Sequence, residues 1–341
     1  MRMDNDVTKI TENALEEGLL LEEGLLLEEG PLLEELAHIK LQKLKRRYRF
    51  FQIGFFVLLV VFGFTIYFNY DYWAFKLLIA NNYVLTDALD EMYATHIRPE
   101  NRQSFHRDFD RVVISVVTSY LSAINNDRFT YLYSPQEHVA VRERRVAVAR
   151  TAAIEPLTDD TVLLFVPNLS RIARDFVIDN RDTLSQYQNL VLDLRGNSGG
   201  WLSDFHRIAD LFVPRGAVMS IEETRIPLFT RTITAPNEPY FDFENIIILQ
   251  NGRTASAAEG LILALQYHMP NAVSIGYTSF GKGIGQVTIP LTGGYAVRAT
   301  VLLVNAPDGE NIHMTGIEPD IAAMPDIDMV DQALALLAQM R

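Results

Sequence analysis

The sequence contains no cysteine among its 341 residues. A chain without thiols cannot build a disulfide scaffold, a thiolate zinc site or a cysteine nucleophile. Hydrophobic residues make up 48% of the chain and charged residues 21%, which excludes a largely disordered protein. The net charge of −13 argues against nucleic acid as the main partner, because surfaces that bind phosphate are basic.

Lysine is also scarce, with six residues against 24 arginines, and Lys282 is the one lysine after Lys76. A buried lysine can lose its proton, whereas an arginine cannot. Lys282 lies between Gly281 and Gly283, and glycines allow the backbone to bend sharply or to approach other groups closely. Lys282 is therefore either a candidate general base or a surface lysine in a flexible loop.

Charge is missing altogether from residues 50–70, which are mostly Phe, Val, Leu, Ile and Gly. About 20 apolar residues span a bilayer, so this stretch is expected to be a transmembrane helix rather than a buried core helix or a cleaved signal peptide. Residues 1–39 carry a net charge of −9, and residues 40–49 carry +6. By the positive-inside rule the N-terminus is cytoplasmic and the residues after about 72 are extracytoplasmic.

The acidic tail, residues 1–49 with its basic end, contains a hexapeptide repeat, Leu-Glu-Glu-Gly followed by two further residues, over residues 15–32. Six residues do not return to one face of a helix, and the repeated glycines weaken a helix further. The tail is expected to be partly disordered. The alternative is a docking segment for a cytoplasmic partner.

From residue 161 onward, short apolar runs alternate with longer amphipathic stretches, which indicates an α/β layered fold with covered sheet faces. We expect a helical subdomain over residues 71–150 and an α/β domain over residues 151–341. The expected strands are residues 161–166, 189–194, 246–249, 272–276, 285–291 and 295–304. The expected helices are residues 83–96, 109–124, 171–185, 202–213, 255–267 and 330–340.

Ser256 follows a buried strand and a glycine turn and opens an apolar helix. Free backbone N–H groups at such a position stabilise a developing oxyanion, so Ser256 is a candidate nucleophile. It is equally a candidate helix cap, because Glu259 follows three residues later as in a capping box.

A second serine, Ser198, lies in Gly196-Asn-Ser-Gly-Gly200, which fits the G-x-S-x-G pattern of a hydrolase nucleophile elbow. An esterase using Ser198 would need a downstream histidine. His268 stands at an expected helix end and His313 in a loop rich in turn residues, so both are expected to be structural or exposed.

Four motifs occur in order along the chain: residues 191–200 (VLDLRGNSGG), 254–259 (TASAAE), 278–283 (TSFGKG, followed by Gln286) and 316–320 (GIEPD). Together they resemble the carboxy-terminal processing, or tail-specific, peptidases, which are serine proteases with a Ser/Lys dyad. The resemblance covers about residues 110–325, and the segment from Asn126-Asp127 to Pro135 also resembles that family.

The resemblance implies a crotonase/ClpP-like layered catalytic domain and a role for each matching residue. Ser256 matches the nucleophile, Lys282 the general base and Gln286 the residue that orients the lysine amine. The backbone N–H groups of Gly200 and Ala257 match the oxyanion hole. The implied function is a membrane-anchored endopeptidase that acts on proteins or peptides without a metal or an organic cofactor.

The chain departs from the family in one respect. Only some 22 residues separate His138 from Thr161, where the family commonly carries a PDZ domain, and an independent domain usually needs about 50. We expect no PDZ domain, which leaves the recognition of substrate C-termini in doubt. A catalytically silent binding or signalling protein on the same fold, or the esterase using Ser198, remains as an alternative.

Overall fold

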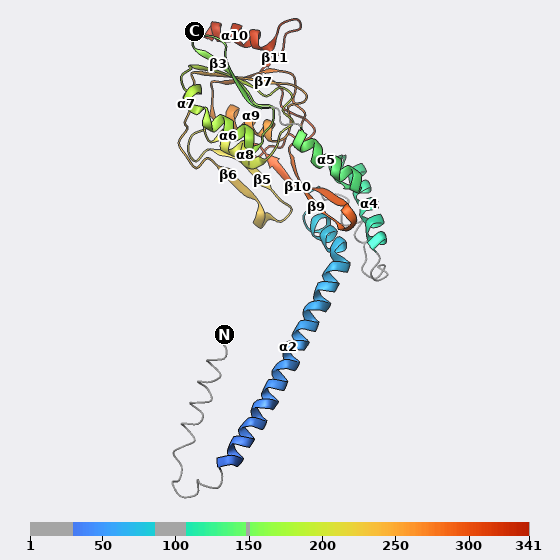
Figure 1. The fold of residues 1–341 in the computed structure, drawn as a ribbon. Helices are drawn as coiled ribbons and strands as arrows, with labels where there is room; N and C mark the ends of the chain where they lie inside the picture. The colour runs from blue at the N-terminus through green and yellow to red at the C-terminus, as the bar shows by residue number, and fades with distance from the viewer. Residues whose placement is uncertain (1–29, 86–106, 148–150, 341) are drawn as a thin grey trace. The chain divides into compact units, whose positions relative to one another are not determined.

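A computed structural model describes residues 30–85, 107–147 and 151–340 (Figure 1). Most of the acidic repeat and most of the helix expected over residues 83–96 lie outside these residues. The chain divides into two compact units, Met1–Tyr67 and Phe68–Arg341. The second unit contains both β-sheets.

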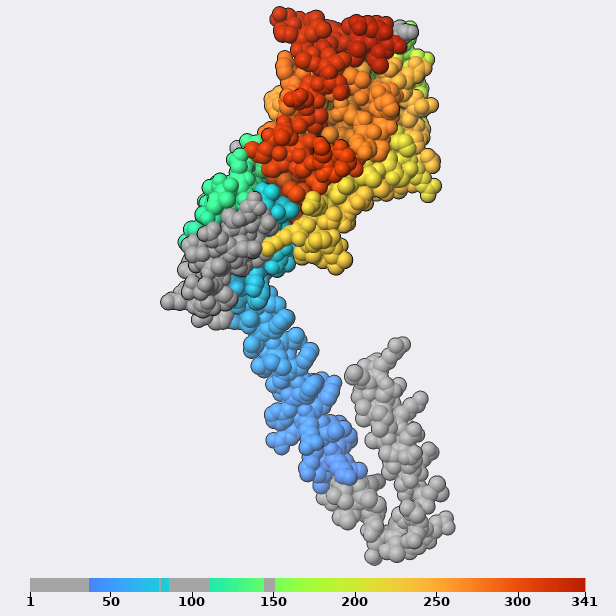
Figure 2. All heavy atoms as spheres, turned by 180° about the vertical axis from the view of Figure 1, so that it is seen from behind, coloured from blue at the N-terminus to red at the C-terminus, as the bar shows by residue number. Residues whose placement is uncertain are grey.

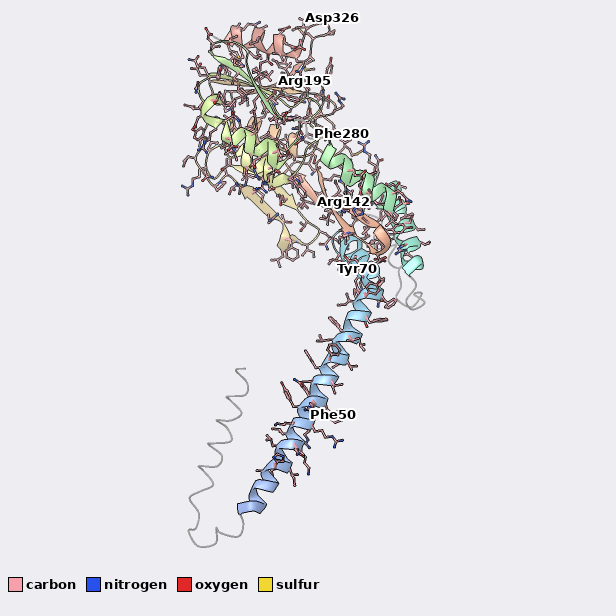
Figure 3. All side chains as sticks on the ribbon, viewed as in Figure 1. Phe50, Tyr70, Arg142, Arg195, Phe280 and Asp326 are labelled. Carbon is pink, nitrogen blue, oxygen red and sulfur yellow. The ribbon has the colours of Figure 1, made fainter. Side chains whose placement is uncertain are left out.

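The charge-free stretch lies within a long helix, α2 (Gly30–Phe75). Phe50 and Tyr70, labelled in Figure 3, mark the two ends of this stretch. Its apolar side chains are largely exposed, as expected for a helix that has no protein around it. The described residues contain one helix that is long enough and apolar enough to cross a membrane, and it is this one. A short π-helix, η1 (Lys76–Ala80), continues from its C-terminal end.

The centre of the second unit is a six-stranded sheet in the order β11-β8-β7-β4-β3-β2. Five of these strands run parallel, and β2 pairs antiparallel with β3 at the edge. In chain order the strands are β2 (Ala153–Pro156), β3 (Thr161–Phe165), β4 (Asn189–Asp193), β7 (Asn245–Gln250), β8 (Ala272–Gly276) and β11 (Ile321–Ala322). Strands β3, β4 and β7 read as continuous apolar runs because helices cover both faces of a parallel sheet.

Successive residues of these strands point to opposite faces and enter two separate cores. Leu164, Leu192 and Ile248 pack on one face with helices α6 (Arg171–Asp179), α8 (Leu202–Ala209) and α9 (Ala257–His268). Leu163, Val191 and Ile247 pack on the other with α10 (Met329–Met340). Figure 1 shows α10 on the side of the sheet opposite to α6, α8 and α9.

A second sheet has the order β1-β10-β5-β6, and β9 pairs with β10 as well. Its strands are β1 (Tyr131–Tyr133), β5 (Val218–Glu223), β6 (Arg231–Thr234), β9 (Ile284–Pro290) and β10 (Ala296–Asn305). The helices α4 (Arg107–Ile124) and α5 (Pro135–Ala147) flank β1 in the chain. In Figure 2 this segment, in green, lies along the red C-terminal part of the chain.

The second sheet has its own small core, in which Phe75 and Tyr83 pack with Val117 and Val297. Asp71, at the end of α2, is 2% exposed and accepts hydrogen bonds from the backbone N–H and hydroxyl of Thr292. Arg111 of α4 lies 3.5 Å from the same carboxylate. A buried carboxylate needs such partners, so Asp71 ties the helix end to the turn between β9 and β10.

The six strands expected from the sequence are confirmed to within two residues. Two expected helices differ: residues 171–185 divide at Asn180 into α6 and α7 (Arg181–Leu184), and α8 ends at Ala209 rather than residue 213. Residues 83–85 are not helical. The short strands β1, β2, β5, β6 and β11, the helix α5 and the 3₁₀ turns η3 (Pro227–Phe229) and η4 (Thr292–Gly294) were not expected.

His206 makes the stability of this unit dependent on pH. Its Nε2 lies 2.9 Å from the hydroxyl of Ser220, and burial, assisted by the charge of Arg231, lowers the pKa of His206 to about 4. Below the unfolded pKa of 6.5 the unfolded chain binds a proton that the folded chain does not, so stability falls as the pH drops toward 4. The wild type loses unfolding free energy between pH 7 and pH 4.5, and we expect this loss to be about 2 kcal/mol smaller in His206→Gln.

The measurement is the unfolding free energy of both proteins at the two pH values. The surface variant His138→Gln serves as the control, because it removes a histidine for which no such burial applies. An equal loss of stability in the wild type and in His206→Gln would contradict the assignment.

Candidate active site

Ser256 lies in the turn where β7 ends and α9 begins. Its φ is 58° and its ψ is −124°, a conformation that costs free energy for any residue other than glycine. Strained strand-to-helix turns of this kind hold the serine of a nucleophile elbow at the junction. The backbone N–H of Ser256 donates to Glu259 Oε2 at 2.6 Å, so the carboxylate half of a capping box is also present.

Ser256 and Lys282 line one small pocket, with a cavity volume of about 10 Å³. The pocket is otherwise largely apolar, with Met219, Leu263 and Ile312 among its walls. An apolar environment disfavours the charged form of an amine. A lysine that acts as a base must be in the neutral form, so such a pocket suits that role. The two residues that the sequence singled out separately are therefore brought to one place.

The glycines on both sides of Lys282 allow its loop to pack closely. Gly281 has a φ of +80°, and a Cβ added there would lie 2.8 Å from the backbone nitrogen of Gly316. A Cβ on Gly283 would lie 2.5 Å from Asn311 Oδ1. Because larger residues do not fit, the glycines fix the path of the loop that carries Lys282.

Glu259 joins the two candidate catalytic residues. Its carboxylate is fully buried and accepts four hydrogen bonds. Oε2 accepts from the backbone N–H groups of Ser256 (2.6 Å) and Lys282 (2.9 Å). Oε1 accepts from the N–H of Gly281 (2.7 Å) and the hydroxyl of Ser279 (2.5 Å). Sequence reasoning treated Glu259 as a helix cap alone, and the capping-box spacing was the signal that pointed to it.

The loop after β4 packs against the Ser256 turn. A Cβ added at Gly199 would lie 2.6 Å from the carbonyl oxygen of Ala255 and 3.0 Å from the backbone nitrogen of Ala257. At Gly200 it would lie 1.8 Å from the carbonyl oxygen of Leu169. This close packing places the two predicted oxyanion-hole residues, Gly200 and Ala257, on neighbouring loops.

The Gly196–Gly200 loop is held by the contacts of Asn197 and by an ion pair just before it. Asn197 is fully buried and donates to the carbonyl oxygen of Val166, and its own carbonyl oxygen accepts from the N–H of Ala255. Arg195, labelled in Figure 3, donates to Asp193 at 2.9 and 2.7 Å. Asp193 and Arg195 thus brace the end of β4.

Ser198 is exposed on this loop, and none of the described histidines forms a hydrogen bond with it. His268 ends α9 and interacts with the carbonyl oxygen of Val218 at 2.7 Å. His313 lies beside Phe129, with 6.5 Å between the ring centroids. Within the described residues, no group of His, Asp and Glu side chains is arranged to hold a metal ion.

His313 is the second residue near the site that sequence reasoning did not select. It is half-buried, and this burial lowers its pKa. Both ring nitrogens are buried without a hydrogen-bond partner among the described residues. The following residue, Met314, donates its backbone N–H to the carbonyl oxygen of Gly281, so this loop packs directly against the Lys282 loop. Its position in a turn-rich stretch gave no signal of this.

Gln286 lies on β9, within the second sheet. Its Oε1 accepts a hydrogen bond from Arg298 at 2.9 Å, and its Nε2 is buried without a partner among the described residues. Arg298 also donates to the hydroxyl of Tyr133 at 3.3 Å. The amide is therefore engaged by Arg298 in this structure, on the strand that directly follows Lys282.

Residues 166–323 match the model of peptidase family S41. Two curated relatives show the same similarity. A carboxy-terminal-processing protease of Bartonella bacilliformis is 38% identical over 144 residues, which cover 42% of this chain and 33% of the relative. The carboxy-terminal processing protease CtpA of Bacillus subtilis is 35% identical over 144 residues, which cover 40% and 29%. The chain thus spans about a third of the length of these relatives.

Solved structures share the fold at low sequence identity. A lipoprotein from Streptococcus agalactiae superposes with a TM-score of 0.60 at 18% identity, covering 80% of this chain and 96% of that chain. The photosystem II D1 C-terminal processing protease gives 0.57 at 16% identity, covering 78% and 95%. The matched region contains Ser256, Lys282 and Glu259. Residues 166–323 of this chain are therefore similar to peptidase family S41.

Proposed function

We propose that this chain is a membrane-anchored serine endopeptidase that cleaves peptide bonds through Ser256 and Lys282. The observation that carries the proposal is that both side chains line one apolar pocket while one buried carboxylate, Glu259, binds both of their backbone N–H groups. The match of residues 166–323 to the model of a peptidase family also supports it.

The reaction is acyl transfer. Neutral Lys282 accepts the proton of the Ser256 hydroxyl, and Oγ attacks the peptide carbonyl carbon. The backbone N–H groups of Gly200 and Ala257 stabilise the oxyanion of the tetrahedral intermediate. Lys282 then protonates the leaving amine, an acyl-enzyme remains on Ser256, and water activated by the same lysine hydrolyses it.

Gln286 has the role of orienting the Lys282 amine. For this the amide must turn away from Arg298, which holds its oxygen in this structure. The mixed parallel and antiparallel sheets, with α9 and β5 packed in a common core, support a crotonase/ClpP-like layered domain over residues 151–341. Residues 71–150 then form the helical subdomain beside it.

The anchor is the charge-free stretch of α2, residues 50–70, with residues 1–49 as a cytoplasmic tail and the peptidase domain extracytoplasmic. The length and hydropathy of α2 and the basic residues 40–49 support this topology. The acidic tail is the part available to a cytoplasmic partner. Protein or peptide substrates are the partners of the peptidase domain.

Covalent labelling of the nucleophile tests this proposal. The full chain in detergent micelles is treated with a fluorophosphonate, digested and analysed by mass spectrometry. We expect the phosphonate on the peptide that contains Ser256, and no label on heat-denatured protein, because only a folded site activates a serine.

Label on Ser198 instead would overturn the dyad and favour the esterase alternative. A folded protein that takes no label and cleaves no unfolded protein substrate would favour a binding or signalling protein on the same fold.

A further inference from the structure

A short segment between α4 and β1, residues 127–130, reaches the candidate active site from the helical part of the second unit. Its end is attached to the second sheet, because the backbone N–H of Thr300 on β10 donates to the Thr130 hydroxyl at 2.9 Å. The pairing of β1 with β10 continues this attachment. The segment is therefore part of the same rigid scaffold as the strand next to the Lys282 loop.

A buried carboxylate fixes the shape of this segment. Asp127 is fully buried and accepts hydrogen bonds from the Thr130 hydroxyl (2.6 Å), the backbone N–H of Phe129 (3.0 Å) and the Tyr83 hydroxyl (3.1 Å). Burial and the nearby Asp127 raise the pKa of Tyr83, so its hydroxyl stays protonated as a donor. These bonds leave the Phe129 backbone little freedom.

The ring of Phe129 faces the candidate base. Lys282 Nζ lies 4.8 Å from its centroid, within the range of a cation–π interaction. The neighbouring Arg128 lies over Phe280 at 4.5 Å, so the segment contacts the Lys282 loop at two points. Phe280 is labelled in Figure 3.

We propose that Phe129 is a positioning residue that holds the amine of Lys282 in the active site; this inference rests on the proposed function. Glu259 fixes the backbone of Lys282, and Phe129 fixes the other end of the side chain. A lysine side chain has four rotatable bonds, so the backbone contact with Glu259 does not by itself set the position of the amine.

An aromatic ring suits this task better than a carboxylate would. The ring attracts the ammonium form of Lys282 through its π face. A carboxylate at the same place would stabilise that form far more strongly and remove the base at neutral pH. Phe129 therefore restrains the side chain at a smaller cost to the neutral form, which is the form that accepts the Ser256 proton.

Nuclear magnetic resonance of the full chain in detergent micelles tests the contact without relying on turnover. The chain has six lysines, so labelling with lysine enriched in ¹³C at Cε gives few signals, and Lys282→Arg assigns the one of interest. A ring at 4.8 Å shifts the Hε protons of Lys282 upfield. We expect Phe129→Leu to abolish this shift and Phe129→Tyr to retain it. Phe280→Leu, which removes a neighbouring ring, is the matched control and should leave the signal in place.

Kinetics on an unfolded protein substrate provide the second readout. We expect Phe129→Leu to lower kcat about tenfold with little change in KM, and Phe129→Tyr to stay within about twofold of the wild type. A Lys282 signal that is the same in wild type and Phe129→Leu would overturn the proposal. If Phe129→Leu does not fold, the wild type alone provides the test. A Lys282 Hε chemical shift equal to that of an exposed lysine would then overturn the proposal. A wild-type protein that shows the ring shift but cleaves no substrate would overturn the proposed function and leave the contact between Phe129 and Lys282 in place.

Discussion

Ser256→Ala should lower the rate of proteolysis at least about a thousandfold, because no other group can form the acyl-enzyme. The variant should fold as well as the wild type, since alanine carries the same Cβ through the strained turn at φ 58°. Ser198→Ala is the matched control, because it removes a serine hydroxyl from the neighbouring loop. It should retain activity within about twofold. Initial rates on a fluorescent unfolded protein substrate provide the measurement.

Lys282→Met belongs to the same experiment. Methionine preserves most of the length and apolar volume of the side chain but has no amine to accept the Ser256 proton. The loss should be comparable to that of Ser256→Ala, and the double variant should be no worse than either single one, because residues that act as a unit are not additive. Full activity in Ser256→Ala or in Lys282→Met would end the dyad assignment.

The sequence predicted the central sheet well because its strands are continuous apolar runs. Residues 161–165, 189–193 and 245–250 are buried on both faces, so their pattern does not depend on which neighbour covers them. Two strands of the second sheet, β5 and β6, were missed for the opposite reason. β6 (Arg231–Thr234) is largely exposed and β5 has an irregular register with it, so neither shows a clean alternation.

In the candidate site, too, the residues predicted from the sequence are those marked by their neighbours in the chain, and the residues missed are those brought close only by the fold. Ser256 and Lys282 were selected from local context: a strand–turn–helix junction for one and an isolated lysine between glycines for the other. Phe129 was not selected, because its contact with Lys282 joins residues far apart in the chain. The hydrogen bond from Arg298 to Gln286 crosses between two strands of a hairpin, and strand register of this kind is not readable from composition.

Glu259 combines both kinds of information. Its spacing from Ser256 is a local capping signal, but its bonds to Ser279, Gly281 and Lys282 form only when the second loop folds onto α9. One residue thus links the formation of the helix to the assembly of the catalytic pair. Damage at Glu259 should therefore lower stability and turnover together.

Glu259→Gln is the sharpest test of this link. The glutamine has the shape of the glutamate, but its side chain presents one acceptor oxygen and an NH₂ group where four donors now meet a carboxylate. Two donors are then left facing an NH₂ group in a fully buried site. Each of them loses a hydrogen bond to a charged acceptor, which lowers the free energy of unfolding. We expect a loss of about 3 kcal/mol in unfolding free energy and a fall in kcat of about a hundredfold.

The matched control is Glu310→Gln, which makes the same chemical change at an exposed glutamate. It should leave both quantities unchanged within about 0.5 kcal/mol and twofold. Stability is measured by denaturant unfolding followed through tryptophan fluorescence, and kcat is measured at a temperature where both variants are folded. A Glu259→Gln protein that keeps its kcat while losing stability would show that the carboxylate supports the fold without placing Ser256 and Lys282. A protein that keeps its stability while losing kcat would show the reverse, because the four bonds would then serve the geometry of the pair more than the cohesion of the loops.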